Sequence, residues 1–216
     1  MQELVQNPCV ENETIMTSVQ SPAKRRTWKV VCCVLVVGLI TIAYAIDRYK
    51  TLYHFETVAP GKLYRSGTLS ARGLKKIHSM TGFKTIINLR STAEREEGSW
   101  YATEKAFADE TGVHLVDLPM LPDVPPTSDQ IGQFLNLATT PGRLPALVHC
   151  EMGVIRTGMM VAVYRVAVLK EANSRVLAEL PMFGHILDEH PAMKEFILHY
   201  SPDSGSSRAT LPKPAS

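Results

Sequence analysis

The clearest structural signal in this chain lies in residues 145–158, Pro-Ala-Leu-Val-His-Cys-Glu-Met-Gly-Val-Ile-Arg-Thr-Gly. The first five of these residues form an apolar run that predicts a β-strand leading straight to Cys150. A short loop containing Gly153 follows, and a helix is expected to begin near Arg156. A strand, a tight loop and a helix in this order place successive backbone N–H groups around a concave loop at a helix N-terminus. Such a loop binds a phosphate dianion through fixed dipoles.

Each side chain of this loop has a chemical reason to be there. Gly153 permits a turn where a Cβ would crowd the backbone, and the planar guanidinium of Arg156 can grip two phosphate oxygens. A helix N-terminus with nearby cations favours the thiolate form of a cysteine, so Cys150 is the expected nucleophile. His149 is expected to orient the loop by hydrogen bonding, and Thr157 to donate its hydroxyl to the sulfur. The predicted phosphate-binding loop comprises Glu151, Met152, Gly153, Val154, Ile155 and Arg156.

The pattern His149-Cys150, five residues, then Arg156-Thr157-Gly158 resembles the signature of the protein-tyrosine and dual-specificity phosphatase superfamily. The resemblance extends from about residue 55 to about residue 200, and segments 62–67 and 86–91 are similar to those of compact atypical dual-specificity-like members. It implies hydrolysis of phosphate monoesters through a phosphocysteine intermediate, with phosphotyrosine or mixed phosphoprotein substrates and without a metal or other cofactor. The competing interpretation of Cys150 is an inert buried thiol at a strand end.

The resemblance also implies a general acid, an aspartate on a mobile loop roughly 25 to 35 residues before the cysteine. Asp123 is the preferred candidate, because two prolines follow it closely in a proline-rich loop between residues 119 and 126. Asp117 is the alternative, although its place at the end of a strand suits a structural role better. A third alternative is that neither aspartate serves as the acid.

Several residues depart from the family pattern or leave a choice open. Glu151 follows the nucleophile directly and would oppose a thiolate if it faced the pocket, so we expect it to point to solvent. Ile155 stands where many compact relatives carry a polar or acidic residue. Arg65 and Arg90 follow strands and are candidates for contact with the substrate, the alternative being solvated or salt-bridged arginines. Glu94, Glu96 and Glu97 are expected to form a charged helix face. Six histidines lack metal-ligand spacing, and no special role is expected for them: His54, His78, His114, His185, His190 and His199.

The order of expected elements predicts an α/β fold with a central, mainly parallel sheet flanked by helices. Strands are expected at 62–65, 83–89, 113–118 and 145–149, and helices at 70–80, 93–111, 128–138, 156–170, 174–183 and 192–200. We assign residues 55–201 to the phosphatase domain, 1–27 to a polar N-terminal segment, 28–46 to a transmembrane helix, and 202–216 to a disordered tail.

Residues 30–46 carry no charge, which reaches roughly the lower limit of ~17 residues for a membrane-spanning helix. The alternatives are a buried core segment and a signal peptide cleaved near Ala43-Tyr44-Ala45. Basic residues are more frequent before the span, at positions 24, 25, 26 and 29, than after it, at 48 and 50. The polar stretch before the span is long for a signal peptide, so we expect an uncleaved signal anchor in a single-pass protein. The positive-inside rule then predicts a catalytic domain on the non-cytoplasmic side.

Composition and cysteine count narrow the binding partners and the metal or disulfide sites that can be expected. The chain carries 23 basic and 21 acidic residues, a net charge of +2, which gives no general attraction to nucleic acid. Of four cysteines, Cys150 alone lies in the predicted domain, so neither a disulfide nor a zinc site is expected there. Three functional alternatives stay open: a phosphatase for phosphoinositides or other small molecules, a catalytically inactive phosphate-binding module tethered to the membrane and, least favoured by the flanking residues, a rhodanese-like sulfurtransferase.

Overall fold

The computed structural model describes residues 22–180 and 189–202. The chain divides into two compact units, residues 1–45 and 46–216, which we treat separately. The first contains most of helix α1 (Pro22–Thr51), and the stretch Val30–Thr51 is long and apolar enough to cross a membrane. Its apolar side chains are exposed, which argues against a buried core helix. The predicted span of 28–46 lies inside α1, whereas most of the polar segment and of the tail falls outside the described residues.

A five-stranded sheet in the order β1-β2-β5-β3-β4 forms the centre of the second unit. Strand β5 (Ala146–His149) lies in the middle and pairs in parallel with β2 (Leu63–Ser66) and β3 (Thr85–Asn88). Strand β4 (His114–Asp117) pairs in parallel with β3, whereas β1 (Glu56–Ala59) is antiparallel to β2 at the other edge. The predicted α/β fold with a mainly parallel sheet is therefore confirmed, and β1 is a strand that the sequence pattern did not reveal.

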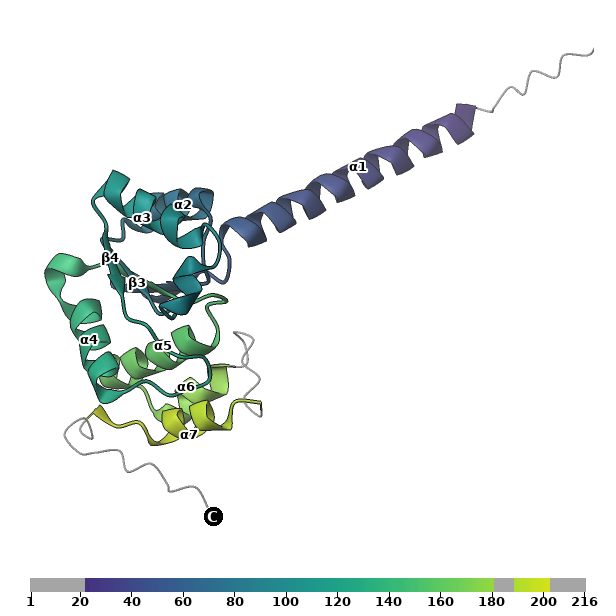
Figure 1. Ribbon diagram of the computed structural model, residues 1–216. Coiled ribbons are helices and arrows are strands. Elements are labelled where there is room, and N and C mark those ends of the chain that lie inside the picture. Colours follow the sequence, from purple (N-terminus) through teal and green to yellow (C-terminus); the bar gives the residue numbers. More distant parts are fainter. Residues whose placement is uncertain (1–21, 181–188, 203–216) are drawn as a thin grey trace, which may run out of the picture. The chain divides into compact units, whose positions relative to one another are not determined.

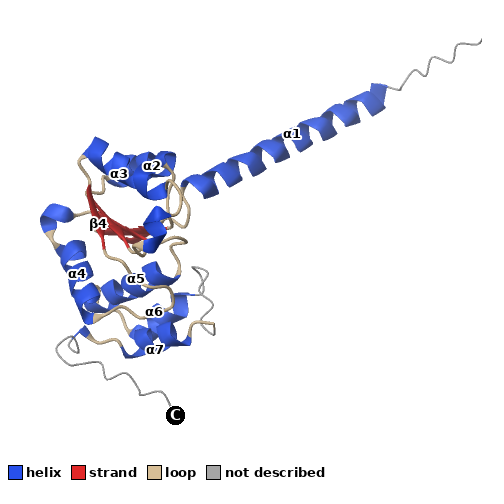
Figure 2. Cartoon of the chain, viewed as in Figure 1, coloured by secondary structure: helices blue, strands red, loops and turns tan. Residues whose placement is uncertain are grey.

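Helices cover both faces of this sheet (Figures 1 and 2). On one face lie α2 (Ala71–Thr81) and α3 (Trp100–Thr111). On the other lie α4 (Ser128–Thr139) and α5 (Ile155–Ala167), with α6 (Asn173–Glu179) and α7 (Pro191–His199) packed further out. Short 3₁₀ turns at Ala93–Glu96 (η1) and Pro141–Arg143 (η2) connect the layers.

Alternation along the central strand explains why two cores form. Successive side chains of a β-strand point to opposite faces, so Leu147 and Val148 of β5 enter different layers. Leu147 packs in a cluster with Phe83 and Phe107 beneath α2 and α3, whereas Val148 packs in a cluster with Met159 of α5. Burial on both faces accounts for the continuous apolar run of β5. This burial also fixes the position of Cys150, the residue that follows β5.

The ends of α2 follow the expected local chemistry. Ser70 caps the helix by accepting a hydrogen bond from the N–H of Gly73, and Gly82 ends it with a left-handed backbone, φ 63°. The prediction of a continuous helix over 93–111 is wrong. Gly98 adopts φ +77° between η1 and α3, and a left-handed residue interrupts the helical hydrogen-bond pattern.

Helix α4 begins as predicted, but a different residue caps it. The cap is Thr127, not Ser128. The hydroxyl oxygen of Thr127 accepts from the N–H of Gln130, and the Gln130 side chain accepts from the N–H of Thr127 in return. This reciprocal capping box satisfies two backbone donors that a serine one position later would leave free.

Candidate active site

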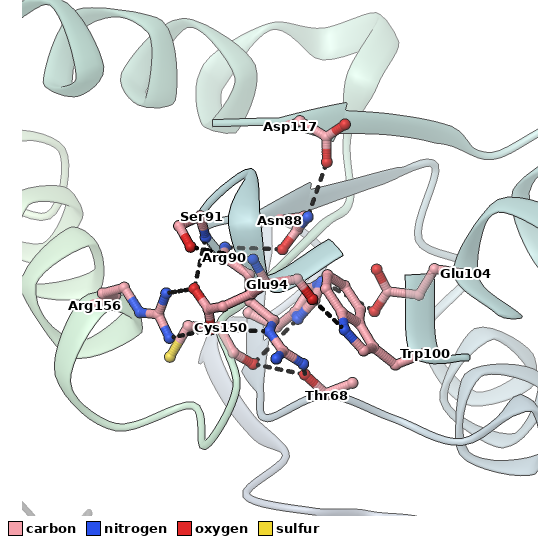
Figure 3. A network of polar contacts seen from close by, with 11 residues as sticks. Thr68, Asn88, Arg90, Ser91, Glu94, Trp100, Glu104, Asp117, Cys150 and Arg156 are labelled. Atoms are coloured by element: carbon pink, nitrogen blue, oxygen red, sulfur yellow. Dashed lines mark hydrogen bonds and ion pairs between the residues drawn. The ribbon is translucent and has the colours of Figure 1, made fainter. Parts of the chain in front are cut away.

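The carboxyl ends of three parallel strands lie level at one edge of the sheet. His149 of β5 pairs in register with Ser66 of β2 and with Asn88 of β3. Cys150, Thr68 and Arg90 follow these strands within two residues and gather at the same edge. In open α/β sheets this edge is where ligands bind. Figure 3 shows the polar network that surrounds Cys150 there.

The first two carbonyl groups of the loop are held from outside the loop. The Cys150 carbonyl accepts a hydrogen bond from Thr68 Oγ1 at 3.2 Å and one from His149 Nδ1 at 3.2 Å. The Glu151 carbonyl accepts from the backbone N–H of Thr68 at 2.8 Å. The expected contact of His149 with the loop is therefore present, and Thr68 is a second support supplied by the segment after β2.

The next two carbonyl groups are held by side chains distant in sequence. The Met152 carbonyl accepts from His54 Nδ1 at 2.6 Å, and the Gly153 carbonyl accepts from Arg65 Nη2 at 2.5 Å. Arg65 is buried, and this burial lowers the pKa of its guanidinium to about 10. Arg65 thus contacts the carbonyl side of the loop.

These contacts determine where the loop's N–H groups point. In a trans peptide the N–H points opposite to the C=O of the same plane. With the carbonyls of residues 150–153 held outward, the N–H groups of residues 151–154 point inward. Within the described residues, these four N–H groups donate to no other part of the protein, and no side chain caps the start of α5. The loop is thus a ring of free donors at a helix N-terminus, an arrangement suited to binding an anion.

Gly153 cannot be replaced by a larger residue without moving the backbone. Its φ is +76°, which side chains rarely adopt, and a Cβ there would lie against the carbonyl of Ser66 and the N–H of Gly67. The sequence argument for this glycine predicted the tight turn. The structure adds that the turn brings the loop against the end of β2.

Arg156 is placed in the first turn of α5 and is paired with Glu94. Its side chain is 7% exposed, and its Nη1 and Nη2 donate to Glu94 Oε2 at 2.6 Å and Oε1 at 3.0 Å. Burial opposes the charged form of Arg156, but the hydrogen bonds to Glu94 raise its pKa overall. Although burial acts in the opposite direction, Arg156 and Ser91 lower the pKa of Glu94 to about 2. Both groups are therefore ionised at neutral pH. The Nε edge of Arg156 makes no hydrogen bond within the described residues and can take an oxyanion.

Glu94 also ties the site to its surroundings. Its carboxylate accepts from Arg90 Nε at 3.1 Å and from the N–H of Ser91 at 2.7 Å, and its carbonyl accepts from Trp100 Nε1 at 2.9 Å. The guanidinium of Arg90 lies 4.0 Å from the centre of the Trp100 ring and donates to Thr68 Oγ1 at 3.3 Å (Figure 3). Arg90 is thus buried in a protein network. The expectation that Glu94 belongs to a solvent-facing helix is wrong, because this side chain is only 15% exposed and binds two arginines.

A second buried pair lies behind the loop. His149 Nε2 is 3.1 Å from Glu104 Oε1, and both side chains are almost completely excluded from solvent. Burial alone would lower the pKa of His149, but the carboxylate of Glu104 raises it overall. The imidazolium form is therefore more favoured in the folded protein than in the unfolded chain, with Nδ1 donating to the loop and Nε2 facing Glu104.

We expect Glu104→Gln to change the pH dependence of stability. Because the pKa of His149 is higher in the folded than in the unfolded chain, the pair stabilises the fold fully below about pH 6.5 and progressively less as pH rises through the folded value. The stability gap between wild type and Glu104→Gln should therefore be wide near pH ~6 and narrow towards pH ~9. Thermal unfolding of both proteins over this range measures it. Parallel curves would show that His149 is not charged in the fold.

The remaining predicted residues are placed as follows. Glu151 is exposed, and Thr157 is fully buried with a hydroxyl that has no hydrogen-bond partner within the described residues, the sulfur of Cys150 included. Asp117 accepts from Asn88 Nδ2 at 2.8 Å and from Tyr101 Oη at 2.6 Å, and forms an ion pair with Arg95 Nη1 at 3.1 Å. Asp123 has a 61% exposed side chain in the loop between β4 and α4.

Four contributors to the site were missed from the sequence: His54, Thr68, Glu94 and Glu104. Thr68 and Glu94 come within six residues of the ends of β2 and β3, so their position at the same sheet edge as Cys150 was a usable signal. Glu104 shares the buried face of α3 with Phe107 and Ala108, and a charged residue on a buried helix face also signals a buried partner. No local pattern distinguishes His54.

This combination of sheet, loop and buried cysteine defines the class of dual-specificity and protein-tyrosine phosphatase-like proteins that use a cysteine nucleophile. Residues 51–193 match the family model described as "DSP-PTPase phosphatase fused to NAD+ Kinase", and the chain belongs to this family. The match covers more than half of the chain and confirms the resemblance drawn from the loop residues.

Two curated relatives show the extent of the likeness. NAD kinase 2, chloroplastic, from Arabidopsis thaliana is 31% identical over 118 residues, 54% of this chain and 11% of that protein. Probable NAD kinase 2, chloroplastic, from Oryza sativa subsp. japonica is 27% identical over 99 residues, 46% of this chain and 10% of that protein. The chain thus spans about a tenth of the length of these relatives.

Solved structures share the fold. The core catalytic domain of the PP-IP phosphatase Siw14 from S. cerevisiae has a TM-score of 0.59 at 24% identity, covering 71% of this chain and 88% of that one. P. aeruginosa TpbA in complex with pTyr has a TM-score of 0.57 at 19% identity, covering 72% and 89%. Identities this low support the fold alone.

Proposed function

We propose that this chain hydrolyses phosphate monoesters through a phosphocysteine intermediate on Cys150. The observation that carries the proposal is the orientation of the loop. Four carbonyls are held outward by groups from other parts of the domain, so four N–H groups converge on the space next to Cys150. Donors fixed before the substrate arrives stabilise the negative charge of a transferring phosphoryl group without reorganising.

The reaction divides into two steps. The Cys150 sulfur, reacting as a thiolate, attacks phosphorus and forms a P–S bond. The P–O ester bond breaks, and the leaving oxygen takes a proton from a carboxylic acid. Water then attacks phosphorus, its proton returns to the carboxylate, and the P–S bond breaks to release phosphate and the thiolate. Thr157, whose buried hydroxyl is unpaired within the described residues, can donate to the departing sulfur.

Asp123 is the proposed general acid. It lies on the loop after β4 with φ +57°, and its Oδ1 is 2.9 Å from His190 Nδ1. In the acid role the carboxyl group would leave His190 and meet the substrate's leaving oxygen. Asp117 is a weaker candidate, because Asn88, Tyr101 and Arg95 already occupy its carboxylate.

We expect Asp123→Asn to remove the limb of the pH–rate profile that reports ionisation of the general acid. It should also lower kcat about 10²-fold for substrates with poor leaving groups. The amide has no proton to give at the leaving oxygen, whereas the binding loop is unchanged. The profile with phenyl phosphate and with p-nitrophenyl phosphate measures the effect. Asp117→Asn is the matched comparison. Loss of the limb in that variant and its retention in Asp123→Asn would reverse the assignment.

Phosphoprotein substrates, phosphotyrosine above all, fit the entrance to the loop best. Residues 151–155 contain a carboxylate and no basic side chain, so they offer no attraction to additional phosphate groups on the substrate. Met152 is 54% exposed, and Leu121 and Val124 are exposed on the loop that carries Asp123. Apolar side chains of this kind suit an aromatic ring next to the phosphate. Likeness in fold to TpbA, solved with pTyr, adds support.

A small phosphorylated molecule is the second candidate. Likeness in fold to the PP-IP phosphatase Siw14 favours it, and so does a membrane anchor if the substrate is a phosphoinositide. Full-length protein in detergent, assayed against phosphopeptides, phosphoinositides and inositol pyrophosphates with and without vanadate, separates the candidates. Vanadate-sensitive turnover highest with phosphotyrosine peptides supports the first proposal. Phosphate binding without turnover of any substrate would identify an inactive binding module.

We further propose that the stretch around residues 28–46 anchors the chain in a membrane with the catalytic domain on the non-cytoplasmic side. Four basic residues precede the uncharged run 30–46 and two follow it, which favours a cytoplasmic N-terminus. Protease treatment of intact cells or spheroplasts tests the orientation. A domain protected until the membrane is permeabilised would show the opposite orientation.

A further inference from the structure

We propose that His54 is a positioning residue of the phosphate-binding loop, so that the segment between α1 and β1 is part of the active site. The proposal rests on the proposed function and adds a residue that contacts neither the nucleophile nor the arginine. Its basis is the 2.6 Å hydrogen bond from His54 Nδ1 to the Met152 carbonyl, across 98 residues of sequence.

The imidazole ring is held in place by two tyrosines. It stacks on the Tyr53 ring with a centroid distance of 4.5 Å and an interplanar angle of 20°. It also meets the Tyr49 ring edge to face at 5.9 Å, and Tyr49 Oη lies 3.3 Å from His54 Nε2. Because a carbonyl oxygen can only accept, Nδ1 is the donor of the bond to Met152. Nε2 in the neutral ring then accepts from Tyr49.

The backbone of the segment is fixed as well. The Tyr53 carbonyl accepts from the N–H of Gly67 at 2.9 Å, which ties the segment to the end of β2. A Cβ on Gly67 would collide with the Tyr53 ring and come 2.9 Å from the Met152 carbonyl oxygen. His54 itself has φ +50°, a left-handed conformation in which histidine and asparagine are enriched. His54 therefore holds a less common backbone conformation at the position from which its Nδ1 donates to the loop.

The peptide between Met152 and Gly153 depends on this donor. Residues 151–154 have no regular secondary structure, and Met152 is exposed at the surface of the loop. If this peptide plane turned over, its N–H would leave the ring of donors and its carbonyl oxygen would face the bound anion. The hydrogen bond from His54 opposes that rotation, and hence keeps the Gly153 N–H aimed at phosphate.

A matched pair of substitutions tests the role. His54→Asn keeps a donor, because asparagine Nδ2 and histidine Nδ1 are both three bonds from Cα, and it tolerates positive φ. His54→Gly also accepts positive φ but has no donor. The full-length protein in detergent is titrated with inorganic phosphate by calorimetry, and kcat/KM is measured with p-nitrophenyl phosphate. Thermal unfolding reports folding, and His54→Asp is a second variant without a donor if the glycine variant unfolds.

We expect His54→Gly to weaken phosphate binding roughly three- to tenfold, with an equal fall in kcat/KM, and His54→Asn to stay within about twofold of wild type. A purely structural role would instead lower the unfolding temperature of both variants without separating their phosphate affinities. Equal phosphate affinity in wild type, His54→Asn and His54→Gly would overturn the role of His54 while leaving the proposed function standing. A wild-type chain that binds phosphate without hydrolysing any ester would overturn the proposed function, and the phosphate titration would still decide the role of His54. A wild-type chain without phosphate affinity would overturn both.

Discussion

Replacing Cys150 by serine should lower turnover by about 10⁴-fold or more while phosphate binding survives. A serine hydroxyl is a far weaker nucleophile than a thiolate at neutral pH, so the P–S bond and the intermediate are lost. The ring of N–H groups at residues 151–154 and the guanidinium of Arg156 remain in place, since the substitution exchanges one small buried side chain for another. Steady-state hydrolysis of p-nitrophenyl phosphate and calorimetric titration with inorganic phosphate measure the two effects.

The loss of rate must come from the missing nucleophile and not from a disordered loop. Unchanged phosphate affinity and an unchanged unfolding temperature in Cys150→Ser provide that control. Activity within about tenfold of wild type would exclude Cys150 as the nucleophile, because a serine in the same place cannot approach the rate of a thiolate.

Arg156→Lys should cost both affinity and rate, together about 10³-fold in kcat/KM. Lysine carries the same charge but as a point charge, so it cannot make two parallel hydrogen bonds to phosphoryl oxygens. The structure adds a second reason. Glu94 binds Arg156 through Nη1 and Nη2 and leaves the Nε edge for the anion, and an ammonium group cannot serve both at once with the same geometry.

Glu94→Gln is an informative companion to this variant. It removes the charge that pairs with Arg156 while keeping a side chain of the same shape, so the guanidinium should remain but lose its fixed direction. We expect a smaller loss than for Arg156→Lys. Near-normal kinetics in Arg156→Lys would mean that the arginine does not contact the substrate. Kinetic constants with p-nitrophenyl phosphate and the inhibition constant for vanadate distinguish the cases.

The fold was predictable from the sequence because its strongest signals are local. A β-branched-rich run gave β3 and an apolar run gave β5, and Ser70 and Gly82 marked both ends of α2. Strand β1 was not predictable, because only its last residue is buried and it lies at a sheet edge. The break before α3 was missed because Gly98 adds one unfavourable residue to an otherwise helical stretch. The helix propensity of a single glycine is a weak effect, and the packing around the segment decides whether the helix continues through it.

The site was predictable where its chemistry lies in one continuous stretch. Residues 149–157 carry their own pattern, so the loop, the cysteine and the arginine could be named in advance. The groups that orient the loop come from elsewhere, and only the folded sheet brings Thr68 and Glu94 to the end of β5. Glu94 sits among other acidic residues, a composition that describes an exposed surface equally well. The contact between His54 and Met152 joins residues 98 apart, and no local spacing encodes such a pair.

Trapping the phosphocysteine intermediate is the decisive test of Cys150 as the nucleophile. Full-length protein is mixed with p-nitrophenyl phosphate, quenched within milliseconds and digested, and the peptide containing residues 146–156 is analysed by mass spectrometry. A phosphoryl group on Cys150 that forms at the rate of the first nitrophenol burst and is absent in Cys150→Ser is the predicted result. Continued turnover with an unmodified Cys150, or a phosphoryl group on any other residue, would contradict the account.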